Sequence, residues 1–142
     1  MRTTKLDKLL SELDACSEAR DWAKGKSLSV AYETCKNAEW MMWLFGRMEG
    51  RQGWPKRPAI VLAACACARL ALRHVPSGED RPRLAIEAAE AWAKDPSEER
   101  RAAARDAAWA AGAAWDAAGA AGDAEHVKMC KLIRKILKPG KI

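Results

Sequence analysis

The stretch that most constrains the fold covers residues 59–94, which read as two helices joined by a short hinge. Its first half carries no charged side chain before Arg69, so a helix there is apolar on nearly every side and must be covered by neighbouring helices. Its second half carries one charged stripe at helical spacing, formed by Arg83, Glu87, Glu90 and Lys94. The sequence therefore predicts a buried central helix followed by a half-exposed one.

The amino-acid composition disfavours β structure. Alanine dominates the second half of the chain, β-branched residues are sparse, and phenylalanine and tyrosine occur once each. A chain of 142 residues is one domain by length, and it can bury about 70% of its unfolded surface without a metal or a disulfide. Its seven tryptophans are the simplest means of filling the space that alanine side chains leave in a core. We therefore expect an all-α, compact single-domain bundle of about six to seven helices with an alanine-rich second half.

The predicted helices fall into three parts of this domain: N-terminal helices at 1–53, the central hairpin at 59–94 and C-terminal helices at 97–138. Residues 46–58 contain three glycines, two prolines and four basic residues. This composition predicts the longest loop of the chain, which is a candidate mobile or binding segment.

Two features bear on where the protein works. Arg69 and Arg73 interrupt the longest apolar run before it reaches membrane-spanning length, so no transmembrane helix and no membrane partner are predicted. The chain has five cysteines, an odd number, and its first residues show no secretion signal. We expect a cytoplasmic protein with reduced thiols.

The residues that could catalyse a reaction or hold a metal form no recognisable motif. Cys65 and Cys67 are two residues apart, so on a helix their side chains point about 200° from each other and cannot both bind one ion. The two histidines, His74 and His126, stand outside any catalytic pattern, and no phosphate-binding glycine loop is present. We predict that the protein is not an enzyme and has no catalytic residue, metal or cofactor.

Charged residues concentrate at the hinge of the central hairpin and at the end of the helix before it. They form a candidate site for a protein partner or an anion, which consists of Arg69, Arg73, His74, Glu79, Arg81 and Arg83. Two interpretations stay open. Either the arginines bind a partner or a small anionic ligand such as a nucleotide, or Glu79, Asp80 or Glu87 pairs with them and fixes the hinge.

The C-terminal segment is strongly basic. Residues 124–142 hold six basic side chains and one acidic side chain, which accounts for most of the formal net charge of +6. Four lysines follow one side of the predicted last helix, namely Lys128, Lys131, Lys135 and Lys138. Such a stripe indicates nucleic-acid binding as an alternative function, or a helix face that is simply solvated.

Several of these segments, in this order, resemble a known family. Trp22-Ala23 is followed by AEWMMWL at 38–44, by ACACARLAL at 64–72, by GEDRPRLAIEAAEAWAK at 78–94 and by an alanine-rich helix. Over about residues 6–137, the chain resembles the predicted all-α immunity proteins of bacterial polymorphic-toxin systems, which also occur among uncharacterised phage proteins. Family members often have a longer alanine helix punctuated by tyrosines, whereas this chain carries Trp109 and Trp115 at such places.

The resemblance implies a function without a reaction. Immunity proteins bind and neutralise a toxin, so the chain is expected to inhibit a protein partner, either a toxin or, in phage counter-defence, a host defence effector. The expected contact surface lies near the hinge arginines or the loop at 46–58. Nucleic-acid binding through the basic C-terminal helix and anion binding at the hinge stay open as alternatives.

Overall fold

The computed structural model describes residues 3–101 and 123–142, and every regular element within these ranges is a helix. The elements are α1 (Lys5–Glu12), α2 (Ser17–Ala23), α3 (Leu28–Thr34), α4 (Ala38–Met48), α5 (Arg57–Ala71), the short 3-10 turn η1 (Leu72–His74), α6 (Arg81–Lys94) and α8 (Asp123–Ile136). The prediction of an all-α bundle is confirmed. The predicted alanine-rich helix, with Trp109 and Trp115, lies outside the described residues. Within the described ranges, no helix combines the length and the apolarity needed to cross a lipid bilayer.

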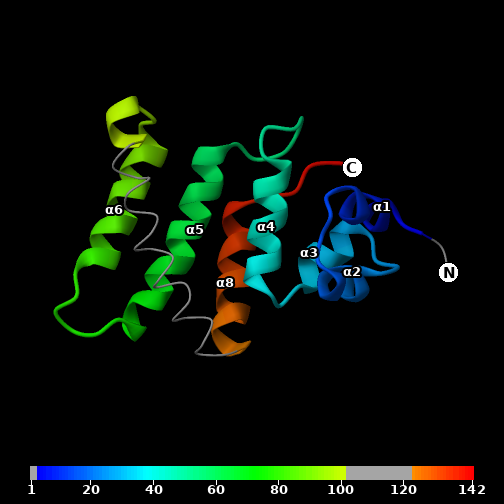
Figure 1. The fold of residues 1–142 in the computed structure, drawn as a ribbon, viewed down its shortest axis with the longest axis horizontal. Coiled ribbons are helices and arrows are strands. Elements are labelled where there is room, and N and C mark those ends of the chain that lie inside the picture. Colours follow the sequence, from blue (N-terminus) through cyan, green and yellow to red (C-terminus); the bar gives the residue numbers. More distant parts are fainter. Residues whose placement is uncertain (1–2, 102–122) are drawn as a thin grey trace.

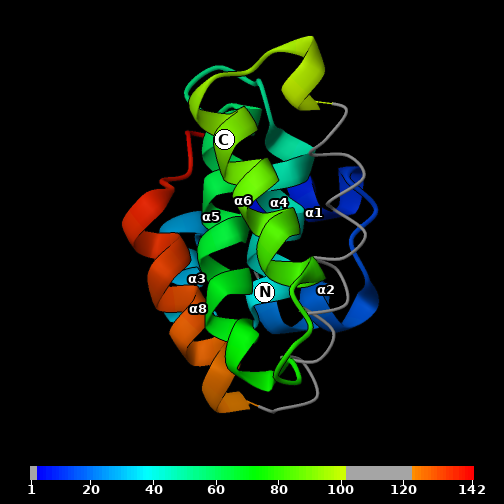
Figure 2. The ribbon, with the colours of Figure 1, turned by 90° about the vertical axis from the view of Figure 1, so that its left-hand side faces the viewer.

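Helix α5 lies at the centre of the bundle. It packs against α6 on one side and against α4 and α8 on the other, and α8 also contacts α4 (Figure 1). The three short helices α1, α2 and α3 gather beyond α4, at the end of the molecule away from α6. Figure 2 shows the molecule from the α6 side, with α6 in front of α5 and α8 beside them. The apolar first half of the central hairpin is therefore covered by several neighbours, as its lack of charge requires.

The main core joins α3, α4, α5 and α8. Its fully buried side chains include Phe45, Cys67, Met129, Cys130, Ile133 and Leu137. The ring of Phe45 makes edge contacts with the rings of Tyr32 and Trp54, each with 5.8 Å between the ring centroids. These aromatic contacts fix α4 against α3 and against the segment that leads into α5.

Local sequence signals set several of the helix ends. Thr4 and Asp7 form a capping box at the start of α1, in which the Asp7 N–H donates to the Thr4 hydroxyl at 3.0 Å. Asn37 caps α4, because its side-chain oxygen accepts a hydrogen bond of 3.2 Å from the Trp40 N–H. Gly25 follows α2 with a φ of +79°, a conformation that glycine adopts without strain.

The loop between α4 and α5 is shorter than the expected segment 46–58. It covers only residues 49–56, because α4 continues through Gly46 to Met48 and α5 already begins at Arg57. Gly46 is exposed, where a glycine costs a helix about 1 kcal/mol, whereas Met48 is buried in the main core. The expected boundary was wrong because this burial outweighs the local preference of glycine.

The loop at 49–56 is held at both ends and in its middle. Glu49 and Arg57 close it with an ion pair of 2.8 Å. Trp54 is buried, and its indole N–H donates to the Lys141 carbonyl at 3.4 Å. The C-terminal segment passes so close that a Cβ on Gly140 would lie 2.5 Å from Cδ1 of Trp54. The loop is thus anchored to the bundle by its central side chain.

Candidate functional site

The arginines on the α6 side of the hinge pair with nearby carboxylates. Arg81 donates to Glu79 at 2.8 and 2.7 Å, and Arg83 donates to Glu87 at 2.9 Å. Hydrogen bonds from the Arg81 side chain and backbone lower the pKa of Glu79 to about 2. These pairs are local in sequence, and they are the ones that the structural interpretation of the hinge anticipates.

Two further arginines join elements that are distant in sequence. Arg69 of α5 donates from Nε to Glu90 of α6 at 2.8 Å. Arg73 of η1 forms an ion pair with the buried Glu125 of α8, and His74 ends η1. The structure thus spreads the predicted site over several elements, and each of its arginines already has a carboxylate partner. A ligand at the hinge would have to compete with these ion pairs. Binding at the hinge stays a prediction.

Removing one of these surface pairs should change stability little. We expect Arg69→Ala and Glu90→Ala to couple by about 0.5–1 kcal/mol in a double-mutant cycle, since 45% and 22% of the two side chains are exposed. Urea unfolding of the single and double variants measures this coupling. Arg81→Ala is the control, because Arg81 pairs with Glu79, two residues before it in the hinge, and this pair does not join α5 to α6. A coupling above about 3 kcal/mol would contradict the prediction and make the pair a major support of the hairpin.

The basic C-terminal segment lies partly on α8 and partly beyond it. Three lysines of the predicted stripe are exposed on the helix, namely Lys128, Lys131 and Lys135. Lys138 follows the end of α8 at Ile136, so the prediction of one helical stripe of four lysines was wrong at this residue. The physical reason is Pro139, which disfavours the helical conformation for the residue before it.

Arg134 and Tyr32 lock α8 onto α3. The Arg134 Nε donates to the Tyr32 carbonyl at 2.9 Å, and the same guanidinium donates to the Cys35 carbonyl. In return, the Tyr32 hydroxyl bonds to the carbonyls of Leu137 and, at 3.4 Å, of Ile133. The last carbonyls of both helices are therefore satisfied by side chains of the other.

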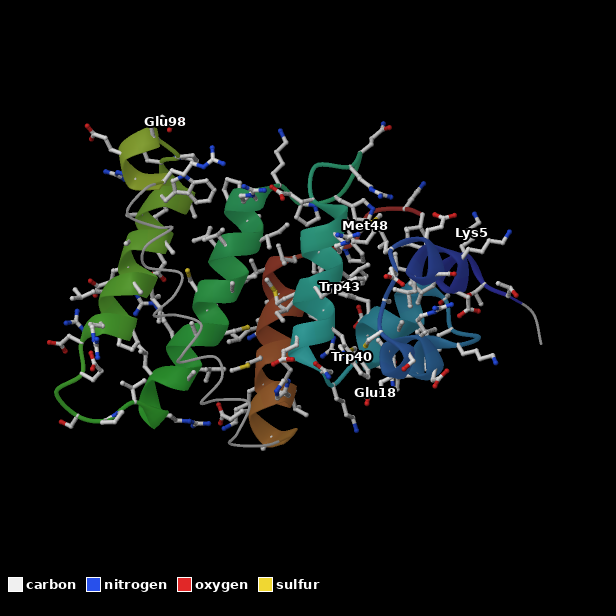
Figure 3. All side chains as sticks on the ribbon, viewed as in Figure 1. Lys5, Glu18, Trp40, Trp43, Met48 and Glu98 are labelled. Atoms are coloured by element: carbon white, nitrogen blue, oxygen red, sulfur yellow. The ribbon has the colours of Figure 1, made fainter. Side chains whose placement is uncertain are left out.

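A pocket of about 510 Å³ lies between α4 and the three N-terminal helices. Trp22, Trp40 and Trp43 line it near solvent, and the buried Tyr32 and Phe45 line its inner wall. Leucine, alanine and methionine side chains complete most of the lining. Figure 3 shows Trp40 and Trp43 on the side of α4 that faces α1, α2 and α3. We call this cavity the tryptophan pocket.

The tryptophans of the pocket differ in their exposure to solvent. Trp22 and Trp40 are partly buried, and their ring centroids lie 6.0 Å apart. Trp43 is 38% exposed, with the Arg47 guanidinium 6.0 Å from its ring centroid. The interpretation of the tryptophans as core fillers is confirmed for Trp54, which is buried, and was wrong for Trp43.

The polar groups of the inner wall already form hydrogen bonds to backbone carbonyls of the chain. The Tyr32 hydroxyl bonds to α8, and the Cys35 thiol donates to the Asn37 carbonyl at 3.4 Å. Burial raises the pKa of Tyr32 to about 12 and also raises the pKa of the Cys35 thiol, so both groups are neutral at pH 7. The inner wall therefore offers an occupant mainly apolar contact.

Two carboxylates, of Asp14 and Glu39, line the pocket where it opens to solvent. Within the part of the chain that the structure describes, neither forms an ion pair, in contrast to Glu79, Glu87 and Glu90 at the hinge. The two pocket carboxylates are therefore available to a cation from outside the molecule.

Comparison with known protein families, with curated proteins and with solved structures finds no match to this chain. The resemblance to immunity proteins therefore stays a prediction. In the described ranges, histidine, cysteine, aspartate and glutamate side chains form no group of three or more that could hold a metal ion.

Sequence reasoning missed the tryptophan pocket, although one signal pointed toward it. The buried side of α4 is formed by Ala38, Met41, Phe45 and Met48. Trp40 and Trp43 lie on a different side, so the helix carries more apolar surface than a single core-facing stripe requires. A second apolar side on a short helix indicates a further contact, either within the molecule or with a partner.

Proposed function

We propose that the chain is a non-enzymatic helical binding protein of a bacterial or phage conflict system, which inhibits a protein partner such as a toxin or a host defence effector. The observation that carries the proposal is the tryptophan pocket, which is open to solvent and flanked by the exposed Trp43. In the complex, an apolar side chain of the partner fills the pocket and the partner surface covers Trp43.

The residue types around the pocket support protein binding. Tryptophan and arginine are the residues most enriched among those that dominate binding energy, and Trp43 and Arg47 stand side by side on α4. Covering the apolar surface of Trp43 contributes about 25 cal/mol for each Å² removed from water. An exposed tryptophan beside an apolar cavity is therefore a favourable centre for an interface.

The wall of the pocket is held in place before any partner binds. Phe45 packs edge-on against Tyr32, and the Tyr32 hydroxyl is bonded to the end of α8. The first turn of α4 is fixed by the Asn37 cap. A wall that is already ordered loses little conformational entropy on binding, which favours affinity.

Nucleic-acid binding is the second candidate, and the exposed lysines of α8 favour it. Lys131 and Lys135 form no ion pair among the described residues, so they could contact phosphates. Such binding weakens steeply as salt is raised, which separates it from binding at an apolar pocket. Anion binding at the hinge is less favoured, because the hinge arginines are paired with carboxylates.

The test is an affinity capture of the tagged chain from nuclease-treated bacterial lysate, washed at moderate salt and followed by mass spectrometry. We expect one stoichiometric protein partner, whose toxicity or activity is suppressed when this chain is co-expressed with it. Trp43→Ala should weaken the complex by about 2 kcal/mol or more, which is at least about thirtyfold in Kd. Circular dichroism and urea unfolding establish that the variant is folded.

Leu84→Ala is the matched control, because Leu84 is also a large exposed apolar side chain but lies on α6, at the other end of the bundle. It should leave the capture unchanged. A partner that binds the wild type and Trp43→Ala equally would contradict the proposed site. Retention of nucleic acid alone, released by salt, would replace the proposal with the second candidate.

A further inference from the structure

We infer that the tryptophan pocket receives an apolar side chain from a basic, amphipathic segment of the partner protein, whose lysine or arginine side chains contact Asp14 and Glu39. The inference rests on the proposed function and adds the chemistry that the partner presents. Its two parts, an apolar anchor and a flanking positive charge, follow from different features of the pocket.

The inner wall selects an apolar anchor. Tyr32 and Cys35 carry polar atoms there, and both already bond to backbone carbonyls of the chain. A polar side chain inserted against this wall would lose its hydrogen bonds to water without replacement, which weakens binding. Leucine, isoleucine, methionine or phenylalanine side chains carry no such cost.

The opening of the pocket selects a positive charge beside that anchor. Although the chain has a formal net charge of +6, Asp14 and Glu39 are the charged residues among those that line the pocket. The exposed Glu18 adds a third carboxylate on the lower side of the view in Figure 3, where Trp40 also lies. An ammonium or guanidinium group there gains attraction to the carboxylates, whereas an acidic segment is repelled.

Two cations, Lys26 and Arg47, lie against tryptophan rings of the pocket. Lys26 lies 4.6 Å from the centroid of the Trp22 ring and also donates to the Trp22 carbonyl. Arg47 stands in the last turn of α4, whereas Glu39 stands in its first turn. Helix α4 therefore carries a negative charge in its first turn and a positive charge in its last turn, which favours one direction for a charged segment that docks along it.

The experiment measures the binding of two fluorescein-labelled synthetic helical peptides by fluorescence anisotropy. Both peptides have one leucine face, and the polar face is lysine in one and glutamate in the other. We expect the lysine peptide to bind at least about tenfold more tightly than the glutamate peptide, a difference of about 1.4 kcal/mol. Because the whole chain is positively charged, general electrostatics alone would give the opposite order.

Two sets of charge variants locate the effect. The double variant Asp14→Asn, Glu39→Gln should weaken the lysine peptide about tenfold and reduce the salt dependence of its binding. Asparagine tolerates the φ of +58° that Asp14 adopts, so the fold is preserved. The control Glu98→Gln, Glu99→Gln removes the same charge from the far end of the molecule and should leave binding unchanged (Figure 3).

Three results would overturn the inference: tighter binding of the glutamate peptide, equal weakening by both double variants, or no binding of the lysine peptide. A concentration-dependent dimer that Trp43→Ala abolishes would also overturn it, since a second copy of the chain would then fill the pocket. The proposed function is judged separately. If Trp43→Ala weakens the binding of a captured partner but the double variant Asp14→Asn, Glu39→Gln does not, the proposed function stands and the inference fails.

Discussion

Phe45→Ala should destabilise the domain by about 3–5 kcal/mol, a large part of the roughly 5–15 kcal/mol that holds a domain of this kind together. Phe45 is 1% exposed, and its ring contacts both Tyr32 and Trp54. Its removal leaves a cavity where α3, α4 and the loop before α5 meet, because the neighbouring rings cannot collapse into it without leaving their own contacts. Equilibrium urea unfolding followed by circular dichroism measures the loss.

Val30→Ala is the control for this substitution. Val30 is a large apolar side chain on α3 that is 50% exposed, so its truncation should change the free energy of unfolding by no more than about 0.5 kcal/mol. Because Phe45 also lines the tryptophan pocket, Phe45→Ala should weaken partner binding even under conditions where the variant stays folded. A loss of stability below about 1 kcal/mol would contradict the close packing described around this ring.

Raising the pH from 8 to 11 should remove several kcal/mol of stability. Burial raises the pKa of the Cys67 thiol to about 12 and the pKa values of Cys65 and Cys130 to about 11, against 9.0 for an unperturbed thiol. Burial likewise raises the pKa of Tyr32 to about 12 from 10.0. The folded state therefore holds these protons more tightly than the unfolded state. Their stabilising effect is complete below about pH 9 and is lost as the pH rises toward 11 or 12.

Urea midpoints measured at pH 8, 9, 10 and 11 test this expectation, with fresh reductant to keep the thiols reduced. Tyr32→Phe should make the loss smaller between pH 10 and 11, because the titrating hydroxyl is gone. At pH 7, the free energy of unfolding of the same variant should be about 1–2 kcal/mol below that of the wild type, since the variant loses the hydrogen bonds to the end of α8. Cys16→Ala, at the exposed cysteine, should follow the wild-type profile. A stability that stays constant up to pH 11 would contradict the burial of these groups.

At the hinge, sequence spacing predicts some of the ion pairs and not others. Arg81 and Arg83 pair with carboxylates two and four residues away, a distance at which chain geometry alone brings the side chains together. The partner of Arg69 is Glu90, on the facing helix of the hairpin, and it was not among the expected partners. Local spacing cannot specify that pair, because it depends on how α5 and α6 lie against each other.

The sequence by itself determined the helices and most of their ends. The Thr4 and Asn37 caps, the Gly25 stop and the apolar α5 each depend on residues within one or a few turns, whose preferences act before any tertiary contact forms. Only the tertiary structure decided that Trp43 stays exposed beside a pocket. Helix α4 is apolar on more than one side, so its pattern does not say which side faces the core. That choice followed from the combined packing of α3, α5 and α8 against it, which no single stretch of sequence encodes.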